Sequence, residues 1–308
     1  MPVQITSFND FDYAAINSRT SDMGKVALIH RWGFDPVAKF QRIGVAGRRL
    51  LSTQGGPTVG LTFKVTGAAT CRIVSQDMTF KGPAGRNGLL VLEGVSPGTG
   101  AKLELQNAAG KAVDLIEVAV AEFNSFKIRY YNLIDGKGRK AVSTIDFAPL
   151  PPNFSPATLT DLTDKVNSIV STQCDCMLFP NGGSTMIDLS TPDDMGERVN
   201  GDTFNIFRFG NMDKNAQYHV VFVWRIAGGH SNGITKNNTT LLEASLSLGK
   251  RPITLAHEFV HFLSGSGVVT VGDHDDNETD LLFKSAPHGI NLRKARLQKI
   301  VGLRKPTP

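Results

Sequence analysis

The stretch that most constrains this chain of 308 residues runs from Ile253 to Leu263, where polar side chains interrupt a strongly apolar segment. His257, Glu258 and His261 form the pattern His-Glu-x-x-His. The apolar residues of this segment would lie on nearly every side of a helix, so we predict that the helix is buried. They are Ile253, Leu255, Ala256, Phe259, Val260, Phe262 and Leu263. Burying three polar groups without partners is costly, so this helix needs a reason to carry them.

The spacing of the polar residues favours a metal site. Residues four apart lie on one face of a helix, so the imidazoles of His257 and His261 can reach a single ion. Glu258 directly follows the first histidine and lies beside the ion without having to bind it. In this motif the glutamate serves a metal-bound water as general base and then as proton donor. The alternative is a buried helix that carries two histidines by chance; we favour the metal because zinc supplies both imidazoles with a partner.

The sequence that follows the helix resembles the metzincin-like zinc peptidases. In the usual family form a glycine stands three residues past the second histidine, and a third histidine stands three further on. This chain has Ser264 and Gly267 at those positions, so the short form is broken. Residues 274–283, however, resemble the family's stretch from the third histidine to the methionine turn: a histidine, small or acidic residues, and an apolar run ending in an aromatic residue.

The resemblance implies that His274 is the third zinc ligand, and a catalytic zinc leaves its fourth position to water. Residues 265–272 then form a longer linker than the family has, and Leu282 replaces the turn methionine as a hydrophobic floor beneath the metal. Asp273 is a second candidate for the third ligand, since carboxylate oxygen binds zinc well. We favour His274 because it matches the family pattern and because histidine is a common zinc ligand.

The first part of the chain has a β pattern. Between residues 44 and 121, short runs such as 61–65 and 102–106 alternate apolar and polar residues. Turn signals rich in glycine and proline separate these runs, for example at Gly55-Gly56-Pro57. This arrangement predicts an all-β domain over residues 1–121, a β-sandwich with an immunoglobulin-like outline.

The second part, residues 122–308, predicts an α+β domain. It contains a strand over residues 126–133 and a helix that begins at Ser155-Pro156, where serine caps the helix and proline occupies its first turn. The continuous apolar run of residues 218–224 predicts a central strand.

The resemblance adds a zincin-type, metzincin-like fold to this second domain. It implies a mixed sheet, the zinc helix and a closing C-terminal helix over residues 291–300. It also implies that an edge strand precedes the zinc helix and pairs with an extended substrate peptide. Residues 234–235 and 241–245 are the candidates for strands in that region.

Composition excludes some other classes of function. The net charge of +5 is modest, and the basic cluster at residues 293–304 has the spacing of a solvated helix face, so we expect no nucleic-acid partner. No apolar run has the length of a membrane span. The N-terminus lacks a secretory signal pattern, so we expect a protein that stays inside the cell, leaves by a signal-independent route or is a mature form. Cys71, Cys174 and Cys176 are too few for a disulfide framework and are expected to be free thiols.

These patterns together predict a zinc-dependent endopeptidase that acts on a protein or peptide substrate. Zn²⁺ is the expected cofactor, held by His257, His261 and His274, and Glu258 is the expected general base. A second hypothesis is a secreted or delivered protein of the binding or adhesin type, in which the β-sandwich is functional and the zinc domain is latent or vestigial. A third is a toxin-like effector that cleaves one target. The intact Glu258 favours an enzyme over the binding protein, because loss of catalysis would most simply appear as loss of that glutamate.

Overall fold

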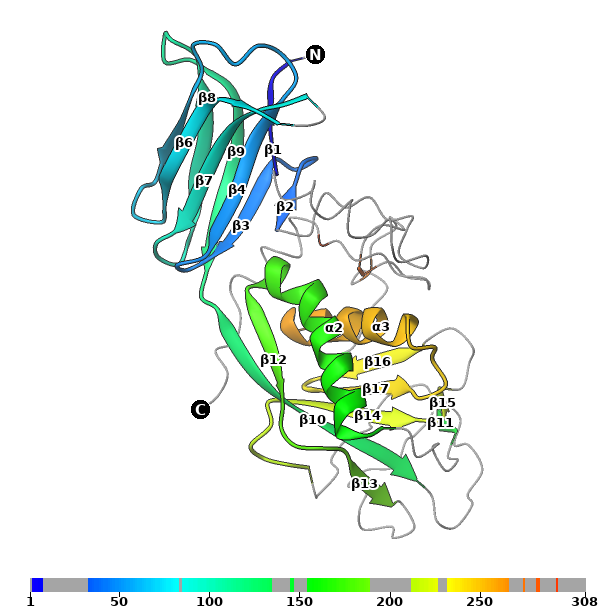
Figure 1. The fold of residues 1–308 in the computed structure, drawn as a ribbon. Coiled ribbons are helices and arrows are strands. Elements are labelled where there is room, and N and C mark those ends of the chain that lie inside the picture. Colours follow the sequence, from blue (N-terminus) through cyan, green and yellow to red (C-terminus); the bar gives the residue numbers. More distant parts are fainter. Residues whose placement is uncertain are drawn as a thin grey trace. The chain divides into compact units, whose positions relative to one another are not determined.

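The computed structural model describes residues 2–7, 33–82, 85–134, 145–146, 154–188, 212–226, 232–265, 274, 281–282 and 292. These residues are mainly β-structure, with three sheets of four or more strands, one two-stranded sheet and two helices (Figure 1). They group into two compact units, and the chain passes from one to the other between Phe123 and Asn124. The first unit also includes Ser171–Asp175 and Leu292. The division into two domains on either side of residue 121 stays a prediction.

The first unit contains two β-sheets. The first sheet consists, in spatial order, of β1 (Gln4–Ser7), β4 (Arg48–Gln54), β7 (Arg86–Gly94) and β6 (Cys71–Lys81). The second consists of β2 (Phe34–Asp35), β3 (Phe40–Gly44), β9 (Ala112–Ala121), β8 (Gly98–Gln106) and β5 (Thr62–Thr66). All pairs are antiparallel except β3 and β9, which run parallel.

A single hydrophobic core joins these two sheets, which shows that they pack face to face. Its buried members come from strands of both sheets and include Ile5, Ile43, Leu51, Phe63, Cys71, Leu90, Leu92, Leu103, Leu105, Ile116, Val118 and Val120. The alternating runs at 61–65 and 102–106 are confirmed as the paired strands β5 and β8. Along β8, Leu103 and Leu105 are fully buried, whereas Lys102 is exposed. This alternation is expected because successive side chains of a strand point to opposite faces of the sheet.

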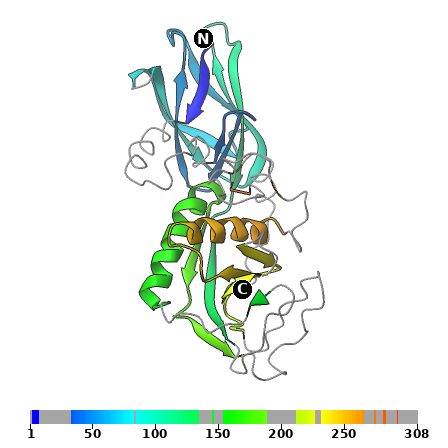
Figure 2. The same cartoon turned by 90° about the vertical axis from the view of Figure 1, so that its right-hand side faces the viewer.

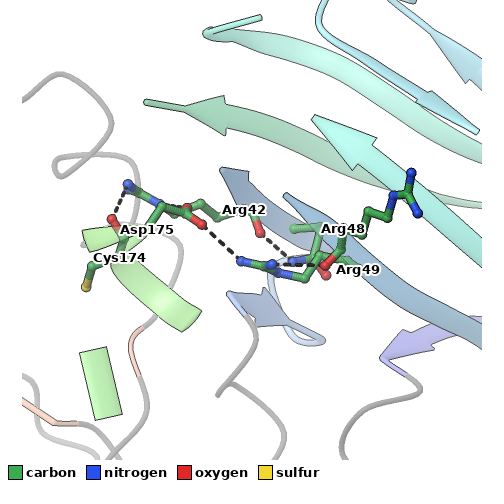
Figure 3. A network of polar contacts seen from close by, with 6 residues as sticks. Arg42, Arg48, Arg49, Cys174 and Asp175 are labelled. Carbon is green, nitrogen blue, oxygen red and sulfur yellow. Dashed lines mark hydrogen bonds and ion pairs between the residues drawn. The ribbon is translucent and has the colours of Figure 1, made fainter. Parts of the chain in front are cut away.

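A buried ion-pair network within the first unit was not foreseen from the sequence (Figure 3). The guanidinium of Arg42 donates from Nε to Asp175 Oδ2 at 2.8 Å and from Nη2 to the carbonyl oxygen of Cys174 at 2.7 Å. Arg49 donates from Nη2 to Asp175 Oδ1 at 3.0 Å. Gly44 lies against this carboxylate, since a Cβ at that position would be 2.8 Å from Asp175 Oδ1. One aspartate thus ties strands β3 and β4 to the segment Ser171–Asp175.

The second unit is built on a mixed sheet. Its strands are, in spatial order, β12 (Cys176–Pro180), β10 (Asn124–Ile134), β14 (Tyr218–Val223), β17 (Thr239–Glu243) and β16 (Gly233–Lys236). β13 (Thr185–Asp188) also pairs with β10, and β11 (Ile145–Asp146) and β15 (Arg225–Ile226) form the separate two-stranded sheet. β16 is antiparallel to β17, and the other pairs in the main sheet are parallel. β16 is the last strand in this order, and every residue of β14 is buried, which confirms the central strand.

Two helices are present among the described residues, α2 (Pro156–Cys174) and α3 (Lys250–Leu263). The predicted cap of α2 is confirmed, because Ser155 Oγ accepts a hydrogen bond from the amide of Thr158. The predicted apolar face of α2 is buried and consists of Leu159, Leu162, Val166, Ile169 and Val170. Neither helix combines the length and the apolar character needed to cross a membrane.

Both helices contact the same face of the mixed sheet (Figure 1, Figure 2). Tyr130 on β10 shares a hydrogen bond of 2.7 Å with Thr163 of α2. Phe126, four residues earlier on the same strand and therefore on the same face, packs edge to face on Phe259 of α3 with ring centroids 5.6 Å apart. The opposite face has its own apolar cluster, made of Tyr131, Leu133, Val221, Val223, Ile226 and Leu241.

Candidate metal centre

Helix α3 carries three residues of the predicted site, and all three are buried. His257, Glu258 and His261 are 2%, 4% and 0% exposed, which confirms the expectation of a buried helix. The one-turn separation of the two histidines brings their Nε2 atoms to 3.0 Å from each other. The spacing of one helical turn therefore places Nε2 of His257 and Nε2 of His261 close together, where both can contact one ion.

His274 joins these two histidines from the chain beyond α3. The ligand nitrogens of the three residues all lie within 4.8 Å of one another. The ring of His274 is centred 5.3 Å from that of His257 and 5.0 Å from that of His261. The structure thus brings together the three histidines that the sequence singled out. The alternative ligand Asp273, most of the linker 265–272 and all of the expected helix at 291–300 except Leu292 lie outside the described residues.

A backbone contact orients the first histidine. Nδ1 of His257 is 2.6 Å from the carbonyl oxygen of Leu281, and both Leu281 and Leu282 are fully buried. A carbonyl oxygen only accepts hydrogen bonds, so Nδ1 carries the proton and Nε2 keeps its lone pair for an ion. Such a hydrogen bond to the far side of a ligand imidazole is the usual way in which proteins orient metal ligands. The sequence pointed to Leu282 as an apolar floor but not to this role of Leu281.

Glu258 is buried beside the histidines. Its Oε1 lies 4.0 Å from Nε2 of His257, and its Oε2 has no hydrogen-bond partner among the residues that the structure describes. Burial raises the pKa of the Glu258 carboxyl to about 8, and the nearby Thr235 hydroxyl has a smaller, opposing effect on that pKa. A buried carboxyl that has one oxygen without a hydrogen-bond partner can take up and release a proton near neutral pH.

The donor set fits a transition-metal ion such as zinc. Imidazole suits zinc, copper, iron and nickel, and three histidines leave one position open on a four-coordinate ion. With metal–nitrogen distances of about 2.0–2.1 Å, two tetrahedral ligands stand about 3.3 Å apart. The 3.0 Å between Nε2 of His257 and Nε2 of His261 is close to that separation. The three histidines could therefore hold one metal ion.

Comparison with known proteins adds no family to this picture. No protein-family model, no curated protein and no solved structure matches the chain. The site therefore has to be understood from its own residues.

Proposed function

We propose that the protein is a zinc-dependent endopeptidase in which His257, His261 and His274 hold the ion and Glu258 is the general base. The observation that carries this proposal is the convergence of three imidazoles beside a buried glutamate with an uncommitted oxygen. The order of the ligands along the chain, two on α3 and one beyond it, agrees with the metzincin-like pattern that residues 257–283 resemble.

The mechanism assigns a separate task to each residue. When bound, zinc supplies a Lewis acid that polarises the scissile carbonyl and lowers the pKa of water toward about 7. Glu258 takes a proton from the attacking water and passes it to the leaving amine. Leu281 keeps the imidazole of His257 in the tautomer that offers Nε2, through the contact of 2.6 Å to its carbonyl oxygen.

The fold of the second unit supports the same proposal. Apart from the two-residue strand β11, which precedes α2, its elements follow the order strand β10, helix α2, strands β12 to β17 and helix α3, as the resemblance to metzincin-like enzymes implies. The antiparallel edge strand β16 comes shortly before α3 along the chain. We infer that an extended substrate peptide adds to the sheet along β16, since peptides in extended form can add as a strand to the edge of a sheet.

We also infer that the first unit is an immunoglobulin-like sandwich. In spatial order one sheet is β1-β4-β7-β6, and the other contains the neighbours β5, β8 and β9. Assigning β1, β4, β5, β6, β7, β8 and β9 to the immunoglobulin strands A to G yields the sheets ABED and CFG of that fold.

The experiment that tests the peptidase is hydrolysis of an unfolded protein by the purified chain, with and without a zinc chelator. Glu258→Gln is the informative variant because it keeps the size of the side chain and removes its basicity. Glu104→Gln, in the first unit, is the matched control. We expect chelator-sensitive hydrolysis that is lost in Glu258→Gln with zinc content unchanged, and retained in Glu104→Gln.

Three results would contradict the proposal. A metal-replete protein that contains no zinc would remove the proposed cofactor. Hydrolysis that persists in Glu258→Gln would exclude this glutamate as the general base. Bound zinc without hydrolysis of any unfolded protein would favour the binding or adhesin-type protein, in which the zinc domain is latent.

A further inference from the structure

The first residue of β16 lies directly against the side chain of Glu258. A Cβ at Gly233 would be 2.8 Å from Cγ and 3.1 Å from Oε1 of Glu258, and 3.0 Å from Cγ2 of Thr254. Carbon atoms do not approach to 2.8 Å without displacement of one of them. Any larger residue at 233 would therefore have to move the glutamate or the strand.

Thr235, the third residue of β16, is hydrogen-bonded to the backbone of Glu258. The Thr235 hydroxyl donates to the backbone carbonyl oxygen of Glu258 at 3.1 Å and lies 2.6 Å from the hydroxyl of Thr240. The Tyr218 hydroxyl in turn contacts Thr240 Oγ1. All three hydroxyl residues, Tyr218, Thr235 and Thr240, are buried.

The direction of this chain of hydroxyl groups follows from the inventory of donors. The carbonyl oxygen of Glu258 can only accept, so Thr235 uses its one proton there. Thr235 then accepts from Thr240, and Thr240 accepts from Tyr218. Each hydroxyl proton is committed, so the chain holds Thr235 in one rotamer beneath α3.

We propose that Gly233 and Thr235 are positioning residues for Glu258, Gly233 by leaving the space that the carboxyl side chain occupies and Thr235 by fixing the helix backbone at the same residue. The catalytic consequence rests on the proposed function of Glu258 as general base. The placement itself does not, since it follows from contacts between β16 and α3. Strand β16 thus both borders the sheet and sets the position of the base.

Placement can be tested without any activity by a double-mutant cycle on stability. Gly233→Ala is expected to lower the urea midpoint of unfolding in the wild-type background. In the Glu258→Ala background, where Cγ and Oε1 are gone, the same substitution is expected to lower it clearly less. Gly183→Ala is the matched control, because its added Cβ would meet no atom closer than 3.5 Å. An equal loss in both backgrounds would overturn the inferred contact.

The catalytic consequence is tested by kinetics on metal-loaded variants of Thr235. Thr235→Val keeps the β-branched shape and removes the hydroxyl, whereas Thr235→Ser keeps the hydroxyl. We expect Thr235→Val to lower kcat by about 10–100-fold with little change in KM, because small misplacements of a catalytic group have effects of this size. Thr235→Ser is expected to restore most of kcat, and both variants are expected to keep their zinc.

The outcomes separate this inference from the proposed function. If the wild type shows no chelator-sensitive hydrolysis, the peptidase proposal fails, while the stability cycle still decides whether Gly233 places Glu258. If the wild type is active and Thr235→Val keeps its kcat, Thr235 is not a positioning residue. A loss of zinc in Thr235→Val would also overturn the inference, because the substitution would then act on the ligands.

Discussion

Removing the charge of Asp175 is expected to destabilise the first unit severely. Asp175→Asn is the cleanest perturbation, because asparagine has nearly the same size and tolerates the left-handed backbone of this position, where φ is +49°. The amide can no longer accept from Arg42 and Arg49 with both of its terminal atoms. Two guanidinium groups would then face each other without the carboxylate between them.

The magnitude follows from the burial of the groups. The side chains of Arg42, Arg49 and Asp175 are 1%, 9% and 5% exposed, so water cannot replace the lost contacts. Breaking a buried ion pair by removing one partner costs about 3–5 kcal/mol. The matched control is Asp161→Asn on α2, whose ion pair with Lys165 involves side chains that are 59% and 51% exposed. Such a surface pair contributes only about 0.3–0.5 kcal/mol.

The assay is equilibrium unfolding in urea, with hydrogen exchange at the amides of β3 and β4 as the local measurement. We expect Asp175→Asn to lower the free energy of unfolding far more than Asp161→Asn. Gly44→Ala should act in the same direction without any change of charge, since its Cβ would lie 2.8 Å from Asp175 Oδ1. A loss below about 1 kcal/mol in Asp175→Asn, within the range of surface pairs, would refute the reasoning.

Three further predictions follow from single residues. His274→Ala should weaken zinc binding strongly while the far-ultraviolet circular dichroism stays unchanged; zinc content after dialysis measures this, and unchanged affinity would point to Asp273 as the ligand. Cys71 should resist a thiol reagent at pH 8 in the native protein and react after denaturation, because burial raises the pKa of its thiol to about 11. Burial lowers the pKa of His219, so the native state binds fewer protons there than the unfolded state, and its stability falls as pH drops below about 6.5. His219→Gln should reduce that fall in urea unfolding at pH 5 relative to pH 7, and an unchanged slope would contradict it.

The sequence predicted those parts of the molecule whose cause is local. The periodicity around His257 indicated a buried helix with both histidines on one face, and the apolar run at 218–224 indicated a central strand; the structure confirms both. His274 could be named only through a resemblance, because its ring approaches the helix from a separate segment.

What could not be predicted depends on contacts between distant segments. Gly233 is one of 31 glycines, and nothing in its neighbours shows that its missing side chain makes room for Glu258. Arg42 and Asp175 are 133 residues apart, so their ion pair has no signature in either stretch of sequence. Single-sequence patterns report which faces are apolar, whereas these contacts depend on how the faces meet.

The packing of α3 provides a test of whether a metal held by the three histidines would serve catalysis or the fold. Phe259 of this helix packs on Phe126 and Tyr218, with ring centroids 5.6 and 5.0 Å apart, so apolar contacts contribute to holding the helix on the sheet. Structural zinc sites, in contrast, supply folding energy that is lost with the metal. The third histidine, His274, is also partly exposed, so an ion held there would be in contact with solvent. We therefore expect a chelator to abolish hydrolysis while the circular dichroism of the protein persists. Unfolding of the second unit on chelation would mean that the three histidines serve the fold instead of the reaction.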